Sequence, residues 1–164
     1  MAIIRNQNKR CLKYTEYDIQ KLLVRTYMSG AKYMVPNMCC TLGEMDMFLL
    51  RRSGYAEEFE IKVSTSDLRA DFKKVCKHRW MKDSYEGQDT KLYLTPNRFS
   101  YVVSDAVKLE GITFPEYAGL YCVKNDRLIC LQSPKLIHKR KLQWYKKVAG
   151  SCCHRLLRAY KLRY

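Results

Sequence analysis

The sequence contains few helix- and strand-breaking residues and no long apolar run. Only 7 of its 164 residues are glycine and 4 are proline, which argues against a disordered or low-complexity chain. No stretch approaches the roughly 20 consecutive apolar residues that a membrane-spanning helix needs. The N-terminus is basic but has neither a continuous apolar segment nor a small-residue cleavage site, so we expect no secretory signal. We therefore expect a protein of the cytoplasm that does not act in a membrane.

The 8 cysteines lack the spacing of metal ligands. No Cys-x-x-Cys pair occurs, although structural zinc sites use two well-spaced ligand pairs. Two pairs are adjacent in sequence and the other cysteines lie in apolar runs, so we expect free, buried thiols. The run Cys152, Cys153 and His154 is a minor alternative as a metal site.

Acidic residues are also scarce. The 16 Asp and Glu are outnumbered by 31 Lys and Arg, which gives a formal net charge of +15. Such a surface favours a polyanionic partner, and nucleic acid is the first candidate. The alternative is that the positive charge only keeps a small protein in solution.

The length fits one domain with its own core, so we expect a single domain over residues 1–164. A Thr side chain with an acid three residues later predicts a capping box and a helix that begins after Thr15. Later patterns predict a helix that begins near Ser64 and continues to Trp80, and a basic helical C-terminal extension from about residue 138 that breaks at Gly150. Short apolar runs bounded by turn signals predict strands at 33–40, 42–51, 55–63 and 91–94, and a hairpin over 117–132.

These elements predict an α/β (α+β) fold, with a mixed central sheet of about four or more strands flanked by helices. Pro36 would be awkward in a central strand, because proline has no backbone N–H to donate. The strand that contains it should lie at an edge of the sheet or be interrupted.

The second and third predicted strands each carry acids on one face. Alternation places Glu44, Asp46 and Phe48 on one face, with Met45, Met47 and Leu49 on the other. In the third strand it places Glu58, Glu60 and Lys62 on one face, with Phe59, Ile61 and Val63 on the apolar face. If Arg51 pairs with Tyr55 across a tight turn, counting back along both strands sets Asp46 opposite Glu60.

Directly paired side chains have Cβ atoms about 4.5 to 5.5 Å apart, close enough for two carboxylates to hold one hard cation. Two such carboxylates repel each other unless a proton or a metal relieves the charge. Mg²⁺ or Mn²⁺ there would polarise a phosphoryl oxygen and activate water, and Lys62 would orient that water or offset negative charge. The alternative is that Glu58, Glu60 and Lys62 are the solvated face of an amphipathic strand.

At this point the sequence resembles a family. Gly43-Glu44-Met45-Asp46 followed by Glu60-Ile61-Lys62 resembles the PD-(D/E)XK nuclease superfamily, and the run from Glu60 to Asp71 is similar to a small bacterial, DNA-repair-associated and phage-encoded branch. The resemblance implies a restriction-endonuclease-like fold, metal-assisted phosphodiester hydrolysis and a bacterial or phage-infected cell. It also implies that Asp46, Glu60 and the backbone carbonyl of Ile61 bind the metal and that Lys62 is the catalytic lysine.

Further residues are candidates for the same site. Such nucleases often add a glutamate from the first helix, and Glu16 fits that role, although an acid in a first turn also complements the helix dipole. Glu44 is either an extra metal ligand or an exposed neighbour of Asp46. The accessory candidates are Asp67 and Asp71, and the candidates for nucleic-acid contact are Ser64, Arg69, Lys73, Lys74 and Lys77.

The sequence therefore predicts a single nuclease domain that depends on Mg²⁺ or Mn²⁺. We expect it to act on DNA rather than RNA, and as an endonuclease rather than an exonuclease. One active site per chain would favour a homodimer for cutting both strands. Two alternatives stay open: a DNA-binding or assembly protein that has lost catalysis on the same scaffold, and an RNA-binding protein whose tyrosines stack on bases.

Overall fold

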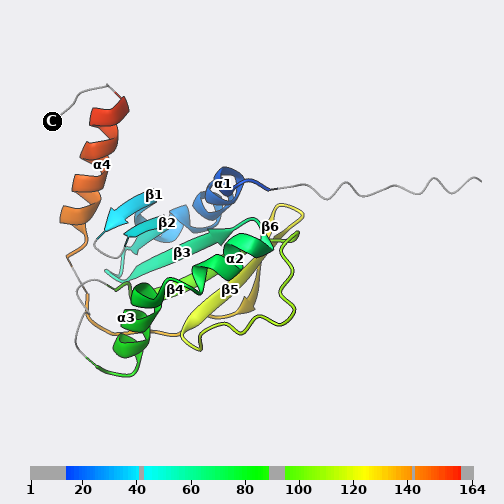
Figure 1. The fold of residues 1–164 in the computed structure, drawn as a ribbon. Coiled ribbons are helices and arrows are strands. Elements are labelled where there is room, and N and C mark those ends of the chain that lie inside the picture. Colours follow the sequence, from blue (N-terminus) through cyan, green and yellow to red (C-terminus); the bar gives the residue numbers. More distant parts are fainter. Residues whose placement is uncertain (1–13, 41–42, 89–94, 142, 160–164) are drawn as a thin grey trace, which may run out of the picture.

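The protein is a mixed β-sheet covered on both faces by helices. The computed structural model describes residues 14–40, 43–88, 95–141 and 143–159 (Figure 1). The N-terminal part contains α1 (Glu16–Tyr27), a 3-10 turn η1 (Met28–Gly30), β1 (Ala31–Cys40), β2 (Gly43–Arg51) and β3 (Ala56–Lys62). The rest contains α2 (Thr65–Asp71), α3 (Val75–Tyr85), β4 (Arg98–Ser104), β5 (Ala118–Lys124), β6 (Arg127–Gln132) and α4 (Tyr145–Ala159).

Six described strands form the sheet in the order β1-β2-β3-β4-β5-β6. The pairs β1–β2, β2–β3 and β5–β6 are antiparallel, whereas β3–β4 and β4–β5 are parallel. Antiparallel neighbours need only a tight turn, while parallel strands need a crossover, which α2 and α3 supply between β3 and β4. The α+β class with a mixed sheet and flanking helices is confirmed. Pro36 lies in β1 at the edge of the sheet, as its missing N–H predicts.

Helix α1 begins where the sequence predicts. The Thr15 side chain accepts a hydrogen bond from the Asp18 backbone N–H at 3.2 Å, and the Thr15 N–H donates to the Asp18 carboxylate, also at 3.2 Å. This capping box satisfies amides that would otherwise have no partner at the helix start. The buried stripe of α1, with Ile19 and Leu23, then packs on the sheet face formed by Leu49, Phe59 and neighbouring residues.

The opposite face of the sheet has two apolar clusters with a polar strip between them. Helices α2 and α3 cover β4 and β5, where Phe99 and Tyr101 lie in the core. Trp144 and α4 cover β1 and β2, and the Trp144 ring lies 5.1 Å from that of Phe48. The strip between them is the face of β3 that carries Glu58, Glu60 and Lys62, and every residue of β3 is buried. This face is therefore not a solvated strand surface.

The helix predicted from Ser64 to Trp80 is two helices, so that prediction was wrong. The chain leaves helical geometry at Lys74, whose φ is −76° and ψ is 66°, and a turn forms there when the Lys74 N–H donates to the Asp71 carbonyl at 2.9 Å. Lys74 and Lys77 both reach Glu60 on β3. These tertiary ion pairs override the helix propensity of the segment. The helical periodicity of the sequence does not predict them.

The C-terminal prediction also needs correction. Residues 138–141 are not helical, because the carbonyls of His138 and Arg140 accept hydrogen bonds from the Asn97 side chain at 2.9 and 2.8 Å. Helix α4 then runs without a break through Gly150. A mid-helix glycine costs only about 1 kcal/mol, which the packing of the buried α4 residues offsets.

The predicted hairpin over 117–132 is confirmed as β5 and β6. The strand predicted at 91–94 lies outside the described residues. Strand β4 was not predicted, because it is buried on both faces and its run Phe-Ser-Tyr-Val-Val does not alternate. In the described part of the chain, no helix is both long enough and apolar enough to span a membrane.

Candidate active site

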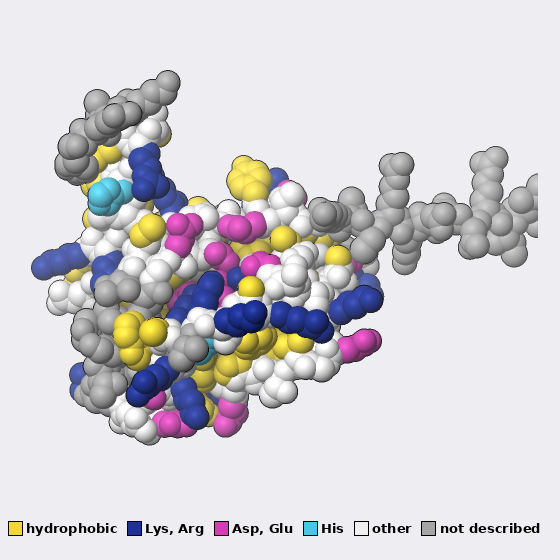
Figure 2. Space-filling model, viewed as in Figure 1, with side chains coloured by type: hydrophobic (Ala, Val, Ile, Leu, Met, Phe, Trp, Pro, Cys, Tyr) yellow, Lys and Arg dark blue, Asp and Glu magenta, His cyan; other side chains and the backbone are white. Residues whose placement is uncertain are grey.

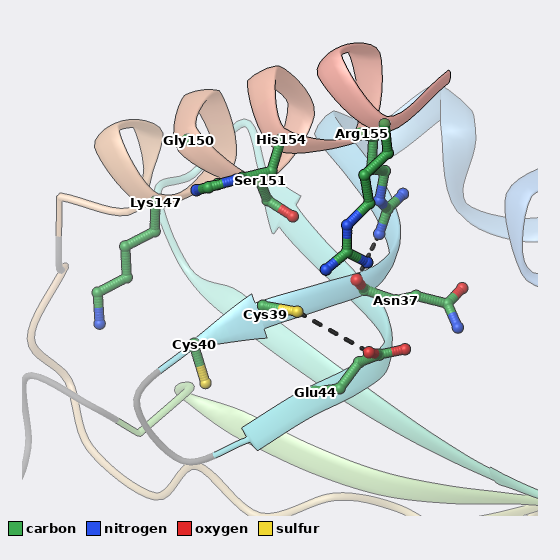
Figure 3. A pocket seen from close by; sticks show the side chains of 10 residues that line it. Asn37, Cys39, Cys40, Glu44, Lys147, Gly150, Ser151, His154 and Arg155 are labelled. Carbon is green, nitrogen blue, oxygen red and sulfur yellow. Dashed lines mark hydrogen bonds between the residues drawn. The ribbon is translucent and has the colours of Figure 1, made fainter. Parts of the chain in front are cut away.

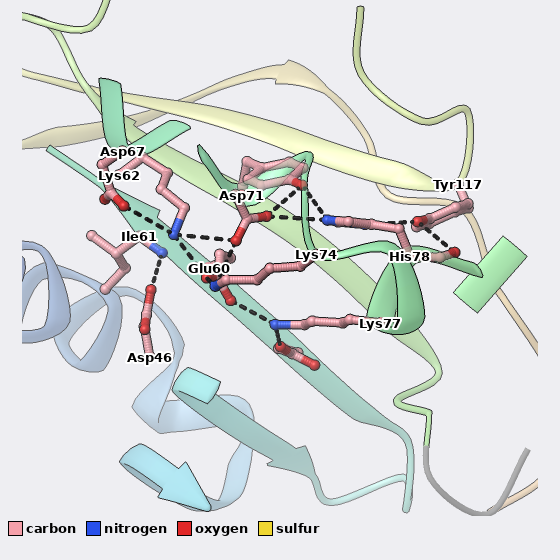
Figure 4. Close-up of polar contacts among 12 residues, drawn as sticks. Asp46, Glu60, Ile61, Lys62, Asp67, Asp71, Lys74, Lys77, His78 and Tyr117 are labelled. Carbon is pink, nitrogen blue, oxygen red and sulfur yellow. Dashed lines mark hydrogen bonds and ion pairs between the residues drawn. The ribbon is translucent and has the colours of Figure 1, made fainter. Parts of the chain in front are cut away.

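Strands β2 and β3 pair in the predicted register. Met47 pairs with Phe59 and Leu50 with Ala56, so the next pair toward the start of β2 would be Asp46 with Glu60. The pairing of β2 with β3 stops before this pair. The Asp46 carboxylate instead accepts a hydrogen bond from the Ile61 backbone N–H at 2.7 Å (Figure 4).

Asp46 is held where a negative charge is unfavourable. Burial, and then the neighbouring carboxylate of Glu60, raise the pKa of Asp46 from 3.8 to about 7, and Glu16 adds a smaller contribution in the same direction. In an extended strand the N–H and C=O of one residue point toward the same neighbouring strand. The Ile61 carbonyl therefore faces the same side as its N–H, toward Asp46.

Gln20 links Glu16 to Asp46, a contact that the sequence reasoning did not predict. Its side-chain amide donates to the Asp46 backbone carbonyl at 3.0 Å, to Glu16 at 3.0 Å and to the Asn37 side chain at 2.9 Å. Glu16 is thus linked through Gln20 to the backbone of Asp46. The signal was available, because Gln20 lies one turn after Glu16 in the buried stripe of α1.

The alternation predicted for β2 fails at one residue. Met45 packs with Phe48 and Trp144 and not with Met47, which faces α1. On the neighbouring strand Asn37 has a φ of 49°, a left-handed conformation that strands do not sustain. This turn in β1 interrupts the alternation of its side chains, so that Val35 and Met38 lie on the same face of the sheet. Met45 pairs with Met38 and lies on that face as well.

Glu60 is surrounded by three lysines (Figure 4). One carboxylate oxygen, Oε1, accepts hydrogen bonds from Lys62 at 2.7 Å and Lys74 at 3.0 Å, and the other, Oε2, accepts from Lys77 at 2.6 Å. Burial alone would raise the pKa of Glu60, but Lys77 and Lys62 lower it below its ordinary value. Glu60 is therefore ionised in this arrangement.

Lys77 is almost as buried as Lys62. Its relative exposure is 5%, and it also contacts the fully buried carboxylate of Glu58. Burial alone would lower the pKa of Lys77, but the carboxylates of Glu58 and Glu60 raise it well above its ordinary value. Lys77 thus serves an internal charge cluster, whereas Arg69, Lys73 and Lys74 are exposed on the surface.

Asp71 is a buried centre of the same cluster. Its carboxylate lies 2.7 Å from Lys74 and 3.5 Å from Lys62, and it accepts a hydrogen bond from Tyr101 at 2.8 Å. It also lies 3.1 Å from His78. Burial opposes ionisation, but His78 and Lys74 lower the pKa of Asp71 far below its ordinary value.

Asp71 therefore connects Lys62 to an aromatic network that the sequence did not reveal. Asp71 lies next to the Nε2 atom of His78, which is also 3.1 Å from the Tyr101 hydroxyl. The Nδ1 atom of His78 lies 3.1 Å from the Tyr117 hydroxyl. These partners come from α3, β4 and the residue before β5. No local sequence pattern could have grouped them.

Three other candidates lie outside the buried charge cluster. Asp67 is exposed and 3.9 Å from Lys62, and its N–H donates to the Ser64 hydroxyl at 3.2 Å. Ser64 is thus the N-cap of α2. Glu44 is exposed and accepts a weak hydrogen bond from the Cys39 thiol in a hollow beside α4 (Figure 3).

The described residues contain no group of three or more His, Cys, Asp or Glu side chains arranged to hold a metal. This applies to Cys152, Cys153 and His154, and both cysteines are exposed free thiols, as are Cys39, Cys76 and Cys130. The expectation of buried thiols was wrong for these residues. A site built from Asp46, Glu60 and the Ile61 carbonyl has two carboxylates and one backbone oxygen, the hard donors that Mg²⁺ prefers.

Comparison with known proteins gives a likeness of fold. No protein-family model matches the chain, and no curated protein matches it. Among solved structures, the chain is similar to a protein of unknown function from Silicibacter pomeroyi, with a TM-score of 0.52, 17% sequence identity and 86% of each chain covered. The likeness extends to the fold alone.

Proposed function

We propose that the protein is a metal-dependent nuclease that hydrolyses phosphodiester bonds, with DNA as its substrate. The observation that supports this most directly is that Asp46 lies where β2 and β3 stop pairing, near enough to Glu60 for the two carboxylates to repel each other. One carboxylate has its pKa raised to about 7 by burial and by the other. A divalent cation between them would relieve the repulsion that a proton otherwise relieves.

The donor set fits Mg²⁺ or Mn²⁺, which Asp46, Glu60 and the Ile61 carbonyl would hold, with Glu16 close by. When bound, such an ion polarises the phosphoryl oxygens and promotes ionisation of water. Lys62 is held by Glu60 at 2.7 Å and by Asp71 at 3.5 Å. Its ammonium is thereby positioned to offset the negative charge that develops on the phosphate.

Access to Glu60 depends on Lys74. Lys74 shares the Oε1 atom of Glu60 with Lys62, and its side chain is 52% exposed. Because it is the most exposed of the three ammonium groups, Lys74 is the one that can turn outward to contact a substrate phosphate. Lys62 and Lys77 are 5% and 6% exposed at the side chain and would stay in place.

The charge of the protein favours the same class of substrate. The net charge of +15 attracts a phosphate backbone, and Arg69, Lys73 and Lys74 are exposed next to the cluster. We propose these three residues and the cap residue Ser64 as contacts to the substrate. A homodimer would bring two such sites to the two strands of a duplex.

A second candidate is a nucleic-acid-binding protein without catalysis. It is favoured by one observation, namely that Glu60 already has an ammonium partner on each oxygen. Such saturation is also what a purely structural charge cluster would show. The intact set of Asp46, Glu60 and Lys62 favours the nuclease.

The experiment is cleavage of plasmid DNA, single-stranded DNA and RNA by purified protein in Mg²⁺, Mn²⁺ or EDTA. We expect cleavage of DNA that requires the metal, and losses of about 100-fold or more in Asp46→Asn, Glu60→Gln and Lys62→Met. The matched control is Glu110→Gln, a change at an exposed acid between β4 and β5 that belongs neither to the candidate site nor to the lining of the hollow beside α4, and it should cleave normally. Undiminished cleavage by Glu60→Gln would refute the proposal, and binding without any cleavage would select the second candidate.

A further inference from the structure

Helix α4 forms one wall of a hollow that the proposed active site does not include. The hollow has a volume of about 550 Å³, and its other wall is formed by the ends of β1 and β2 nearest their connection (Figure 3). From α4 it is lined by residues spaced as one stripe of a helix, namely Lys147, Gly150, Ser151, His154, Arg155 and Arg158. This size is typical of a site for a small ligand or for a short piece of a polymer.

The lining of the hollow favours an anionic ligand. Lys147, Arg155 and Arg158 carry full positive charges, and Glu44 is the one carboxylate among the described lining residues. Figure 2 shows Lys and Arg side chains on the side of α4 that faces the body of the molecule, with Asp and Glu side chains gathered between α4 and α1. On the surface seen in Figure 2, the cations therefore lie along α4 and the acids lie between α4 and α1.

The hollow adjoins the Asp46 site through shared residues. Arg155 donates hydrogen bonds to the backbone carbonyls of Pro36 and Asn37, and Asn37 itself lines the hollow. The Asn37 side chain accepts from Gln20, which also donates to the Asp46 carbonyl. A ligand in the hollow would therefore lie next to the residues that hold Asp46.

We propose that this hollow binds the sugar–phosphate backbone of one nucleic-acid strand beside the phosphate that is cleaved. The inference rests on the proposed function and adds where the strand lies. Apart from the imidazole of His154, the described lining residues include no aromatic side chain on which a base could stack. Recognition by cations alone should be tolerant of base sequence, because every nucleotide presents the same phosphate.

Gly150 provides a direct test of the charge in the hollow. A Cβ atom added at Gly150 meets no other atom within 4 Å, and any of the usual helix-forming residues is accommodated better than glycine within a helix. We would compare Gly150→Lys, Gly150→Gln and Gly150→Glu. The last two have the same shape and differ only in charge.

The assay is binding of fluorescein-labelled oligothymidine and of a mixed-sequence single strand, followed by anisotropy in EDTA so that no cleavage occurs. Relative to Gly150→Gln, we expect Gly150→Glu to weaken binding by about threefold to tenfold and Gly150→Lys to strengthen it by a similar factor. Both oligonucleotides should respond alike. Circular dichroism of each variant confirms that α4 remains folded.

Three results would overturn the inference. Equal affinities of the Glu, Gln and Lys variants would show that no phosphate approaches Gly150. Equal weakening by all three relative to wild type would show a steric effect, and a response of only one oligonucleotide would show recognition of bases. Because binding is measured without metal, it is tested separately from cleavage. If the proposed nuclease activity is wrong, wild-type protein will not cleave DNA, but the affinities of the Gly150 variants will still depend on the charge at position 150.

Discussion

Glu60 is the residue on which the ion pairs of the candidate site converge. It lies on β3 and has partners on β3 itself and on the turn and helix that follow α2. A buried charge needs such partners, because the loss of hydration costs several kcal/mol per ion. Removal of one partner leaves the other charges buried without compensation.

This reasoning predicts that Lys77→Met destabilises the protein by about 3–5 kcal/mol, since Glu58 and Glu60 would both lose their shared ammonium partner. Lys74→Met should cost less than about 1 kcal/mol, because that side chain is half exposed. Urea denaturation followed by circular dichroism measures both. The double variant Lys77→Met with Glu58→Gln should recover part of the loss, and equal effects of the two single variants would contradict the prediction.

A second prediction at this scale concerns pH. Burial and the Glu60 carboxylate raise the pKa of Asp46 from 3.8 to about 7, so the folded protein keeps a proton that the unfolded chain has released. The stability from this proton is present in full below about pH 4 and is lost as the pH rises to about 7. Each unit of pKa shift corresponds to about 1.4 kcal/mol.

Asp46→Asn cannot ionise, so in EDTA its free energy of unfolding should fall less between about pH 4 and about pH 7 than that of wild type. The control is Glu110→Gln, which removes one exposed carboxyl group outside the candidate site. Parallel profiles of Asp46→Asn and wild type would show that Asp46 is not protonated in the folded state.

At the scale of elements, the sheet and helices are fixed by close contacts between segments distant in sequence. Asn97, just before β4, accepts a hydrogen bond from the Ala56 N–H of β3 at 2.8 Å and donates to the carbonyls of His138 and Arg140. It thereby connects the start of β3 to the segment that leads into α4.

Substitution of two glycines by alanine tests the packing of these elements, because we expect one change to lower the stability of the fold and the other to raise it. A Cβ at Gly119 in β5 would lie 2.5 Å from the Ser100 hydroxyl and 2.9 Å from Pro134, so Gly119→Ala should destabilise by about 1–3 kcal/mol through overpacking. Gly150→Ala in α4 meets no atom and should stabilise by about 0.5–1 kcal/mol. Thermal unfolding of both variants measures the difference. Two changes of the same sign would show that one of these elements is packed otherwise.

At the scale of the whole molecule, charge governs the encounter with a polyanion. A net charge of +15 on 164 residues produces long-range attraction that salt weakens. Affinity for single strands should fall with salt, with a slope in log–log coordinates of about −0.7 for each phosphate neutralised.

Arg158→Gln should therefore reduce that slope by about 0.7, since Arg158 lines the hollow and would release one counterion fewer. Titrations at several salt concentrations give the slope for wild type and variant. Lys82→Gln, a change at an exposed lysine of α3 that lies outside the hollow, is the control and should leave it unchanged. An unaltered slope in Arg158→Gln would mean that no phosphate contacts α4 at this position.

The sequence by itself determined the features that depend on neighbouring residues. The cap at Thr15, the edge position of Pro36 and the register that brings Asp46 toward Glu60 all follow from local hydrogen bonding, alternation and turn length. The candidate trio Asp46, Glu60 and Lys62 could be named from three features of the sequence together, namely alternation along the strands, the hairpin register and the family resemblance.

Only the tertiary structure decided which charges meet. Lys77 pairs with Glu60 from 17 residues away and Lys74 from 14, and these ion pairs end the helix that the local pattern favours. Strand β4 lies next to β3 because its apolar residues are buried on both faces, and α4 lies on β1 so that the hollow forms between them. Such contacts form only when segments distant in sequence are buried together. A charged side chain is stable in water, but its burial costs free energy unless it is paired with an opposite charge.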